Sequence, residues 1–388
     1  MSTVNQIYQI VNSLNSQANG GGALAVTDTR SFISYGESVF SSDHNVETFF
    51  KALWDRIATT ILDNRPYMAQ LVSGLWREPF EYGAIMQKIH AKLPDAQADP
   101  AWSETSDMPS NPFAVTPMEI EQRMYNKISA FEIPATYPDV QLKTAFLDER
   151  KMAAFIDAMM VQQRNALELS IENLGNVARS ALIATAIEAG GAKNVKLLTG
   201  FKATLADDDP LQNLTAADAL FNREFLRYAS RAIAMVIDHM KTMSTLHAAD
   251  GYHRFTPREY LNVAVLSDFD KSVESYLASA TYWKSLVELP TENKVIVPYW
   301  QGAGTSFDYA DTSTIKLTID DGTELGDKVE VSNVVAVVYD SEAAGITIDE
   351  RRTKSIYNPH DEVTNLWLKA RQMYFVDVTQ NAVAFTID

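Results

Sequence analysis

The side chains best suited to catalysis or metal binding are scarce in this sequence. The chain contains no cysteine, which excludes disulfides, thiolate zinc sites, iron–sulfur clusters and cysteine nucleophiles. Its six histidines are His44, His90, His239, His247, His253 and His360. His239 and His247 would lie about 12 Å apart on one continuous helix, too far to bind the same metal ion. The histidines therefore predict no metal site.

The motifs that position catalytic or phosphate-binding groups are also missing. The sequence has no His-Glu-x-x-His, Gly-x-Ser-x-Gly or phosphate-loop pattern. The run Gly302-Ala303-Gly304-Thr305-Ser306 lacks the third glycine of a dinucleotide-binding turn, and acidic runs such as 207–209 lack the spacing of a calcium loop. We predict no catalytic residue, no cofactor and no metal ligand, hence no enzyme. A site assembled in space from distant residues stays open.

Composition narrows the possible partners. The chain has 388 residues, with 50 acidic residues against 33 basic ones and a net charge of −17. Such a surface repels phosphate, which excludes a nucleic-acid-binding module unless basic residues cluster. The densest basic stretch holds Arg351, Arg352 and Lys354 and is too small for a nucleic-acid footprint. We interpret these three residues as partners for acids on another subunit.

The chain ends and apolar runs predict where the protein resides. No apolar run approaches the ~20 residues of a membrane span, and the N-terminus lacks a signal-peptide pattern. These features favour a soluble cytoplasmic protein without membrane contact. Residues 1–22 are polar and end in three glycines, so we expect a mobile arm. Its apolar residues recur at helical spacing, and a short amphipathic helix is the alternative.

The elements that follow the arm alternate between helical and extended patterns. Apolar residues at helical spacing predict a helix over 46–62, which ends before Pro66. Residues 82–92 and 128–146 read as extended segments, and we expect them to be the two arms of a hairpin.

The segment between these arms, Pro94 to Pro117, has an unusual composition. It contains five prolines and four acidic residues but no Lys or Arg. A loop of this length is improbable inside a compact domain, so we expect a protruding tip that orders on a partner. Trp102 and Phe113 lie within it and are candidate anchors for a neighbouring subunit. An ordinary disordered insertion is the alternative.

The strongest periodic signal lies between Asp148 and Ala189. Apolar residues repeat every three or four positions until Gly190 and Gly191, which form a normal helix stop. A helix of this length spans about 63 Å, more than the ~55 Å diameter expected for a compact chain of this size. We therefore predict one long helix and an elongated subunit with lateral neighbours.

The remainder of the chain reads as α+β. Residues 196–345 predict a helix over 215–243 and strands over 261–266, 294–299, 314–319 and 329–339. Residues 373–378 and 382–387 are rich in β-branched and aromatic residues, so we expect the chain to end in a sheet.

This order of elements resembles the Hong Kong 97-like fold of tailed-phage major capsid proteins. Two stretches are also similar to capsid sequences of small podoviruses: Tyr-His-Arg-Phe-Thr-Pro-Arg-Glu-Tyr at 252–260 and Tyr-Asn-Pro-His-Asp-Glu at 357–362. The resemblance implies an N-terminal arm and helices (1–65), an extended hairpin loop (66–147) that lies over the adjacent subunit, and an axial domain (196–345). Residues 148–195 and 346–388 would form a peripheral domain with the spine helix and terminal strands.

The resemblance also implies a function. The chain would self-assemble into hexamers and pentamers of an icosahedral shell around a double-stranded DNA genome, without sequence-specific DNA contact. Scaffolding and portal proteins are candidate partners, and the protein would assemble in the host cytoplasm and reside in the virion capsid. No motif singles out a cross-linking lysine on the hairpin. The alternatives are an encapsulin-like compartment shell and, in another class, a soluble α+β hydrolase with a spatially assembled site.

Overall fold

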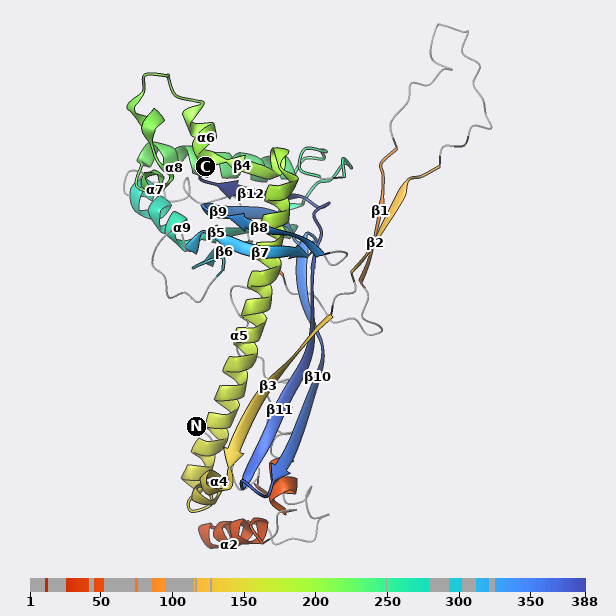
Figure 1. Ribbon diagram of the computed structural model, residues 1–388, viewed down its shortest axis with the longest axis vertical. Coiled ribbons are helices and arrows are strands. Elements are labelled where there is room, and N and C mark those ends of the chain that lie inside the picture. The colour runs from red at the N-terminus through yellow and green to blue at the C-terminus, as the bar shows by residue number, and fades with distance from the viewer. Residues whose placement is uncertain are drawn as a thin grey trace. The chain divides into compact units, whose positions relative to one another are not determined.

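The computed structural model describes residues 11–12, 26–41, 45–51, 74–75, 86–94, 115, 117–125, 128–248, 250–278, 293–301, 312–320 and 325–388. The chain divides into two compact units. The first unit contains Met1–Val72, Ile128–Leu174 and Thr347–Met373, and the second contains Ser73–Lys127, Gly175–Ile346 and Tyr374–Asp388. Figure 1 labels their helices and strands. Each unit is described by itself.

The first unit is built on a three-stranded sheet with the order β10-β11-β3 (Figure 1). Its strands are β3 (Ile128–Pro138), β10 (Ala344–Asn358) and β11 (Val363–Val376), although the ends of β10 and β11 belong to the second unit. β11 is antiparallel to β3, with Val363 opposite Pro138 and Met373 opposite Ile128. Side chains alternate across a strand, so Leu366 and Leu368 share the buried face of the sheet.

Helices cover this sheet and form the core of the first unit. They are α2 (Thr29–Val39), α4 (Asp139–Ala145) and the N-terminal part of α5 (Glu149–Ala189). The core includes Phe32, Tyr35, Tyr137, Leu142, Phe146, Met152, Ile156, Leu366 and Leu368. Gly36 permits close contact between α2 and Phe146, since a Cβ at this position would lie 2.7 Å from the aromatic ring.

The long helix predicted over 148–189 is confirmed as α5, a single helix of 41 residues. At 1.5 Å per residue it is about 60 Å long. Gly175 does not interrupt it, because one glycine costs a helix only about 1 kcal/mol. The helix ends before Gly190 and Gly191, both of which have positive φ angles. No described helix is both long and apolar enough to span a membrane.

The second unit is built on a five-stranded sheet with the order β4-β12-β9-β5-β6. The strands are β4 (Asn194–Lys196), β5 (Leu261–Leu266), β6 (Asn293–Val297), β9 (Val334–Asp340) and β12 (Ala382–Thr386). Every residue of β5, β9 and β12 is buried, which explains their continuous apolar sequences. The predicted strands at 261–266 and 382–387 are therefore confirmed.

Helices pack on one face of this sheet. They are α6 (Leu197–Lys202), α7 (Ala216–Ala219), α8 (Arg223–Met240) and α9 (Ser267–Val273), followed by a π-helical turn (Glu274–Ala278). Short 3₁₀ turns occur at Gly191–Lys193, Pro210–Asn213 and Arg258–Tyr260. The apolar face of α8, which includes Phe225, Ile233 and Val236, packs against alternate residues of the central strands.

Two elements that were predicted as continuous in this unit each consist of two separate elements in the structure. The helix expected over 215–243 is α7 and α8, because Asn222 caps a new helix by accepting from the backbone of Phe225 at 3.0 Å. The strand expected over 329–339 is β8 (Leu325–Val331) and β9, which are separated at Asn333 by a positive φ of 59°. β7 (Ile315–Asp320) pairs with β8.

The predicted hairpin is wrong in its pairing. β1 (Met86–Ala91) is antiparallel to β2 (Ile120–Tyr125), whereas the predicted second arm, 128–146, contains β3 and the helix α4. β3 pairs instead with β11, a partner more than 200 residues away in the sequence. The residues between β1 and β2 are the predicted tip, most of which lies outside the described residues.

Two N-terminal predictions also lie largely outside the part of the chain that the structure describes. Residues 45–51 are helical, in agreement with the start of the helix predicted over 46–62, but 52–73 are not described. Of the predicted arm over 1–22, only residues 11 and 12 are described. They are helical, and Val11 is buried in the core of the first unit, which contradicts a mobile arm at these positions and agrees with the alternative of a short helix. For the other residues of 1–22 the arm stays a prediction.

Candidate functional site

The β1–β2 hairpin of the second unit has two chemically different faces. Residues opposite each other in an antiparallel pair share a face. The pairs Lys88 with Arg123 and His90 with Glu121 therefore lie on one face, and Ile89 with Gln122 and Ala91 with Ile120 lie on the other. The second face is exposed, with Ile89 63% and Ile120 62% accessible. The apolar face of a sheet usually packs on the protein and the charged face is exposed to solvent. In this hairpin the charged face points toward its own unit and the apolar face is exposed.

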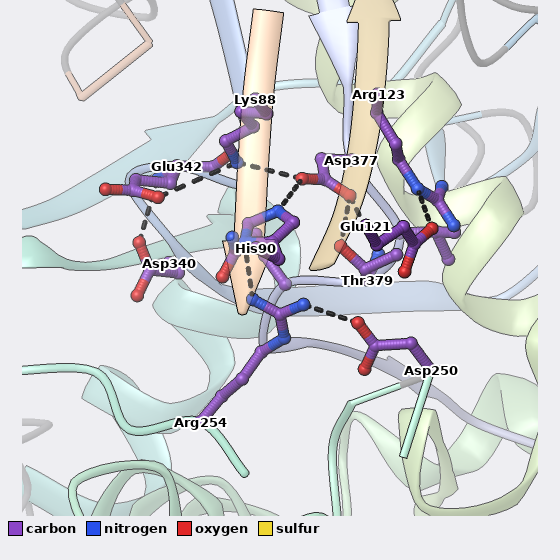
Figure 2. Close-up of polar contacts among 12 residues, drawn as sticks. Lys88, His90, Glu121, Arg123, Asp250, Arg254, Asp340, Glu342, Asp377 and Thr379 are labelled. Carbon is purple, nitrogen blue, oxygen red and sulfur yellow. Dashed lines mark hydrogen bonds and ion pairs between the residues drawn. The ribbon is translucent and has the colours of Figure 1, made fainter. Parts of the chain in front are cut away.

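The charged face ends in a buried ion pair. Lys88 Nζ donates to Asp377 Oδ2 at 2.8 Å and to the backbone oxygen of Glu342 at 2.8 Å (Figure 2). The Lys88 side chain is 14% exposed, and that of Asp377 is completely buried. The Glu342 carboxylate lies 3.7 Å from the same Nζ. A strand that would otherwise be solvated is thus tied by charge to residues that follow β9 and β11.

The local sequence explains why Asp377 is positioned rigidly. It follows β11 directly, and its Oδ1 accepts from the backbone nitrogen of Thr379 at 3.0 Å and from its hydroxyl at 2.5 Å. This is an Asx-type turn, which Asp favours because its short side chain reaches the backbone two residues on. The backbone nitrogen of Asp377 also donates to the oxygen of Ala343 at 2.7 Å. These bonds fix the position of the Asp377 carboxylate independently of Lys88.

His90 makes a second connection from the same strand. Its Nε2 lies 3.6 Å from Asp377 Oδ2, and its Nδ1 lies 3.3 Å from an Arg254 guanidinium nitrogen (Figure 2). Because guanidinium only donates, Nδ1 is the atom of His90 that can accept from Arg254. Arg254 also pairs with Asp250, whose side chain is almost completely buried. His90 thus connects Asp377 to the Arg254–Asp250 pair.

The surroundings shift the pKa of several of these groups. Burial alone would raise the pKa of Asp377, but the charge and hydrogen bond of Lys88 and the two bonds from Thr379 lower it to about 2. Burial lowers the pKa of Lys193 to about 8, against the opposing charges of Asp377 and Asp250. The Lys193 ammonium donates to the backbone oxygens of Val378 and Gln380. Asp377 therefore stays ionised at neutral pH.

An aromatic contact completes the attachment of the hairpin. Tyr125, the last residue of β2, is buried, and its ring centroid lies 5.6 Å from that of Phe375 on β11. Lys88 Nζ lies 6.0 Å from the centroid of the same Phe375 ring. Such contacts bury apolar surface, and the tilted arrangement of the two rings is one that aromatic pairs commonly adopt. The charged groups add directional hydrogen bonds.

Comparisons with known proteins identify the family. The sequence profile described as Phi29-like phage major capsid protein matches residues 7–386. The chain belongs to this family. It is a phage major capsid protein, which favours the shell interpretation over the encapsulin and hydrolase alternatives. A comparison with curated proteins finds no match.

Solved structures agree with the fold of a capsid protein. The capsid structure of Staphylococcus phage Andhra matches with a TM-score of 0.52 and 11% identity, over 82% of this chain and 83% of that chain. A chain in the structure of the head fiber and inner core protein gp22 of native bacteriophage P68 also matches with a TM-score of 0.52 and 11% identity, over 81% and 83%. These structural matches confirm the predicted α+β capsid fold.

The contact residues predicted for this capsid protein are only partly described. Trp102 and Phe113 lie outside the described residues, as does the side chain of Arg351. Arg352 and Lys354 are exposed on β10, an edge strand of the sheet in the first unit. The described residues contain no group of three or more His, Asp or Glu side chains arranged to hold a metal ion.

The charged attachment of the hairpin was not predicted from the sequence. Lys88 attracted attention only as one of several lysines on the hairpin, and Asp377 lies 289 residues away. One usable signal was present. Lys88, His90 and Tyr125 alternate with apolar residues on short strands, and such alternation indicates that the two faces have different surroundings.

Proposed function

We propose that this major capsid protein assembles with copies of itself into an icosahedral shell of hexamers and pentamers around double-stranded DNA. The exposed apolar face of the β1–β2 hairpin carries this proposal. In addition to Ile89 and Ile120, the exposed apolar residues of the hairpin and its extension are Leu93, Val115, Met118 and Met124. A cluster of this kind on one element marks a protein-interaction surface. The partner we propose is a second copy of the chain.

The sequence-predicted contacts fit the same proposal. We assign Trp102 and Phe113 of the tip to an apolar depression on a neighbouring copy, and Arg351, Arg352 and Lys354 to the acidic residues of a tip. The net charge of −17 supports a shell that does not adhere to packaged DNA and makes no sequence-specific contact with it. Scaffolding and portal proteins are proposed as partners during assembly in the host cytoplasm. No enzymatic activity is proposed.

The domain assignment belongs to this proposal as well. We propose that residues 196–345 form the axial domain of each hexamer or pentamer. Residues 148–195 and 346–388 form the peripheral domain, and the hairpin region 66–147 extends over the adjacent subunit. The arm and first helices occupy 1–65.

The proposal is tested by replacing apolar residues on the exposed face of the hairpin. Ile89→Ser combined with Ile120→Ser removes two exposed side chains without touching the charged face. We expect the variant to remain a folded protomer while the parent forms rings or shells, as measured by sedimentation velocity and negative-stain imaging over a concentration series. Gln122→Ala, on the same face, is the matched control and should assemble normally.

Two results would contradict the proposal. If the double variant builds particles of the same size at the same concentration as the parent, the apolar face is not an assembly contact. If the parent stays monomeric throughout the series, the chain does not assemble from its own copies alone.

A further inference from the structure

The attachment of the β1–β2 hairpin to its unit depends on side chains. β1 and β2 form a separate two-stranded sheet, and neither strand pairs with the five-stranded sheet of the same unit. Described side chains that make contacts across this boundary include Lys88 with Glu342 and Asp377, His90 with Arg254, and Tyr125 with Phe375 of β11. Backbone pairing therefore does not set the direction in which the hairpin leaves the unit.

Charged groups of both signs meet beneath the hairpin. Lys88 and Arg254 carry positive charge, and Asp377, Asp250 and Glu342 carry negative charge (Figure 2). Lys88 contacts Asp377, whose side chain is completely buried. Removing one member leaves an uncompensated charge in a largely buried place, which is strongly unfavourable.

A buried ion pair contributes little net stability but demands a specific geometry. The desolvation cost of Lys88 and Asp377 offsets most of their attraction, so hydrophobic replacement of both groups is often neutral for stability. Charge-assisted hydrogen bonds, however, weaken when donor and acceptor leave the short distance and angle found here. The Lys88 contact with Asp377 therefore restricts the hairpin to a narrow range of positions.

We infer that Lys88 and Asp377 are positioning residues that fix the direction of the β1–β2 hairpin and so present its apolar face to one neighbouring copy. This inference rests on the proposed function, because the apolar face matters only if it is an assembly contact. Thr379 supports the same geometry by holding the other oxygen of the Asp377 carboxylate, Oδ1. The hairpin of an unassembled protomer is therefore already oriented.

Because the chain has no cysteine of its own, spin labels attach only at cysteines that are introduced. The direction of the hairpin can therefore be measured in the full chain. Gln122→Cys on the exposed hairpin face and Thr242→Cys beyond α8 place two spin labels at exposed sites of the same unit. Double electron–electron resonance on unassembled protomers then gives the distribution of distances between the labels. We expect one narrow distribution in this labelled parent, and at least a twofold greater width after Lys88→Met or Asp377→Asn.

Three further variants separate positioning from general stability. Lys92→Met removes an exposed ion pair on the same hairpin, with Lys92 Nζ 3.0 Å from Glu119, and should leave the width unchanged. Lys88→Arg keeps the charge and should keep the distribution narrow. Lys88→Met combined with Asp377→Leu removes both members of the ion pair, so neither is left without the other. This variant should fold even if a single variant does not, and its distribution should be broad.

The outcomes distinguish this inference from the proposed function. Broad distributions together with impaired shell formation support it. Unchanged widths in Lys88→Met, Asp377→Asn and the double variant overturn it, whatever the assembly result. Broad distributions with normal shells also overturn it, because hairpin direction would then not matter for assembly. A narrow distribution in the parent and broad ones in the variants, with a parent that never forms particles, support the positioning role and contradict the proposed function instead.

Discussion

Asp377 is one source of acid sensitivity in this capsid protein. Its pKa is lowered from 3.8 to about 2 in the folded chain, so its pairing stabilises the fold fully above pH ~4. This contribution, on the order of 2 kcal/mol, is lost as the pH falls from about 4 to about 2. The Asp377→Asn variant cannot lose stability in this way at low pH, because the asparagine side chain takes up no proton in this range.

We therefore expect the stability difference between the parent and Asp377→Asn to be large at pH 7 and to shrink toward pH 2. Urea unfolding at both pH values measures it. An equal difference at both pH values would mean that the Asp377 charge is not what stabilises this region.

His247 gives a second pH dependence, at higher pH. Burial lowers its pKa, the hydrogen bond with the Ala192 oxygen at 3.2 Å opposes this effect, and the charges of His239 and Lys193 lower it further. The unfolded chain therefore takes up the proton more readily, so the fold loses stability as the pH falls through about 6.5. His247→Asn should flatten the dependence of the melting temperature between pH 7.5 and 5.5. Parallel curves for the two proteins would contradict this origin.

At the scale of elements, α5 offers a matched pair of leucines. Leu167 is 5% exposed and Leu169 is 59% exposed on the same helix. Leu167→Ala should cost about 2 to 5 kcal/mol because it removes buried methyl groups and leaves a cavity. Leu169→Ala should change the unfolding free energy by less than about 0.5 kcal/mol. Chemical denaturation measures both, and similar losses would mean that α5 does not bury the predicted face.

The same helix shows what the sequence alone could predict. The ends of α5 follow from apolar spacing and two glycines, and β5 follows from a short run of β-branched residues, because both signals are local. The pairing of β1 with β2 was missed because partner choice depends on contacts far along the chain. β10 was missed because exposed residues such as Arg352 and Lys354 interrupt its apolar pattern.

The site shows the same limit. The prediction that the charged residues of this chain serve contacts rather than catalysis came from missing motifs. The Lys88 contact with Asp377 joins two segments that no spacing rule relates, since it depends on the turn at Thr379 and on the face of β1 that points inward. Trp102, Phe113 and Arg351 stay predictions.

At the scale of the whole molecule, the acidic tip is expected to matter for assembly and not for folding. Deleting residues 98–113 should leave a soluble protomer with nearly unchanged helix content but prevent closed shells. Circular dichroism and negative-stain imaging measure the two properties. Particles of normal size and stability from the deletion variant would identify the tip as an ordinary surface loop.

The proposed basic partners of the tip give an independent test. Reversing Arg351, Arg352 and Lys354 together should weaken assembly mainly at low salt, because exposed ion pairs are screened by salt and are individually worth less than about 1 kcal/mol. Light scattering over a salt series measures this. Equal weakening at high salt would point to lost packing instead of lost charge pairing.

The outward apolar face of the β1–β2 hairpin has a thermal consequence for the assembled state. Burying Ile89, Ile120 and Met124 against a neighbour removes apolar surface from water, so association should have a negative heat-capacity change. The hydrophobic contribution then weakens on cooling. Intermediates held mainly by this face should dissociate near 0 °C and re-form on warming. Calorimetry of parent assembly at several temperatures measures the slope of the assembly enthalpy with temperature, and a slope of zero would contradict this origin.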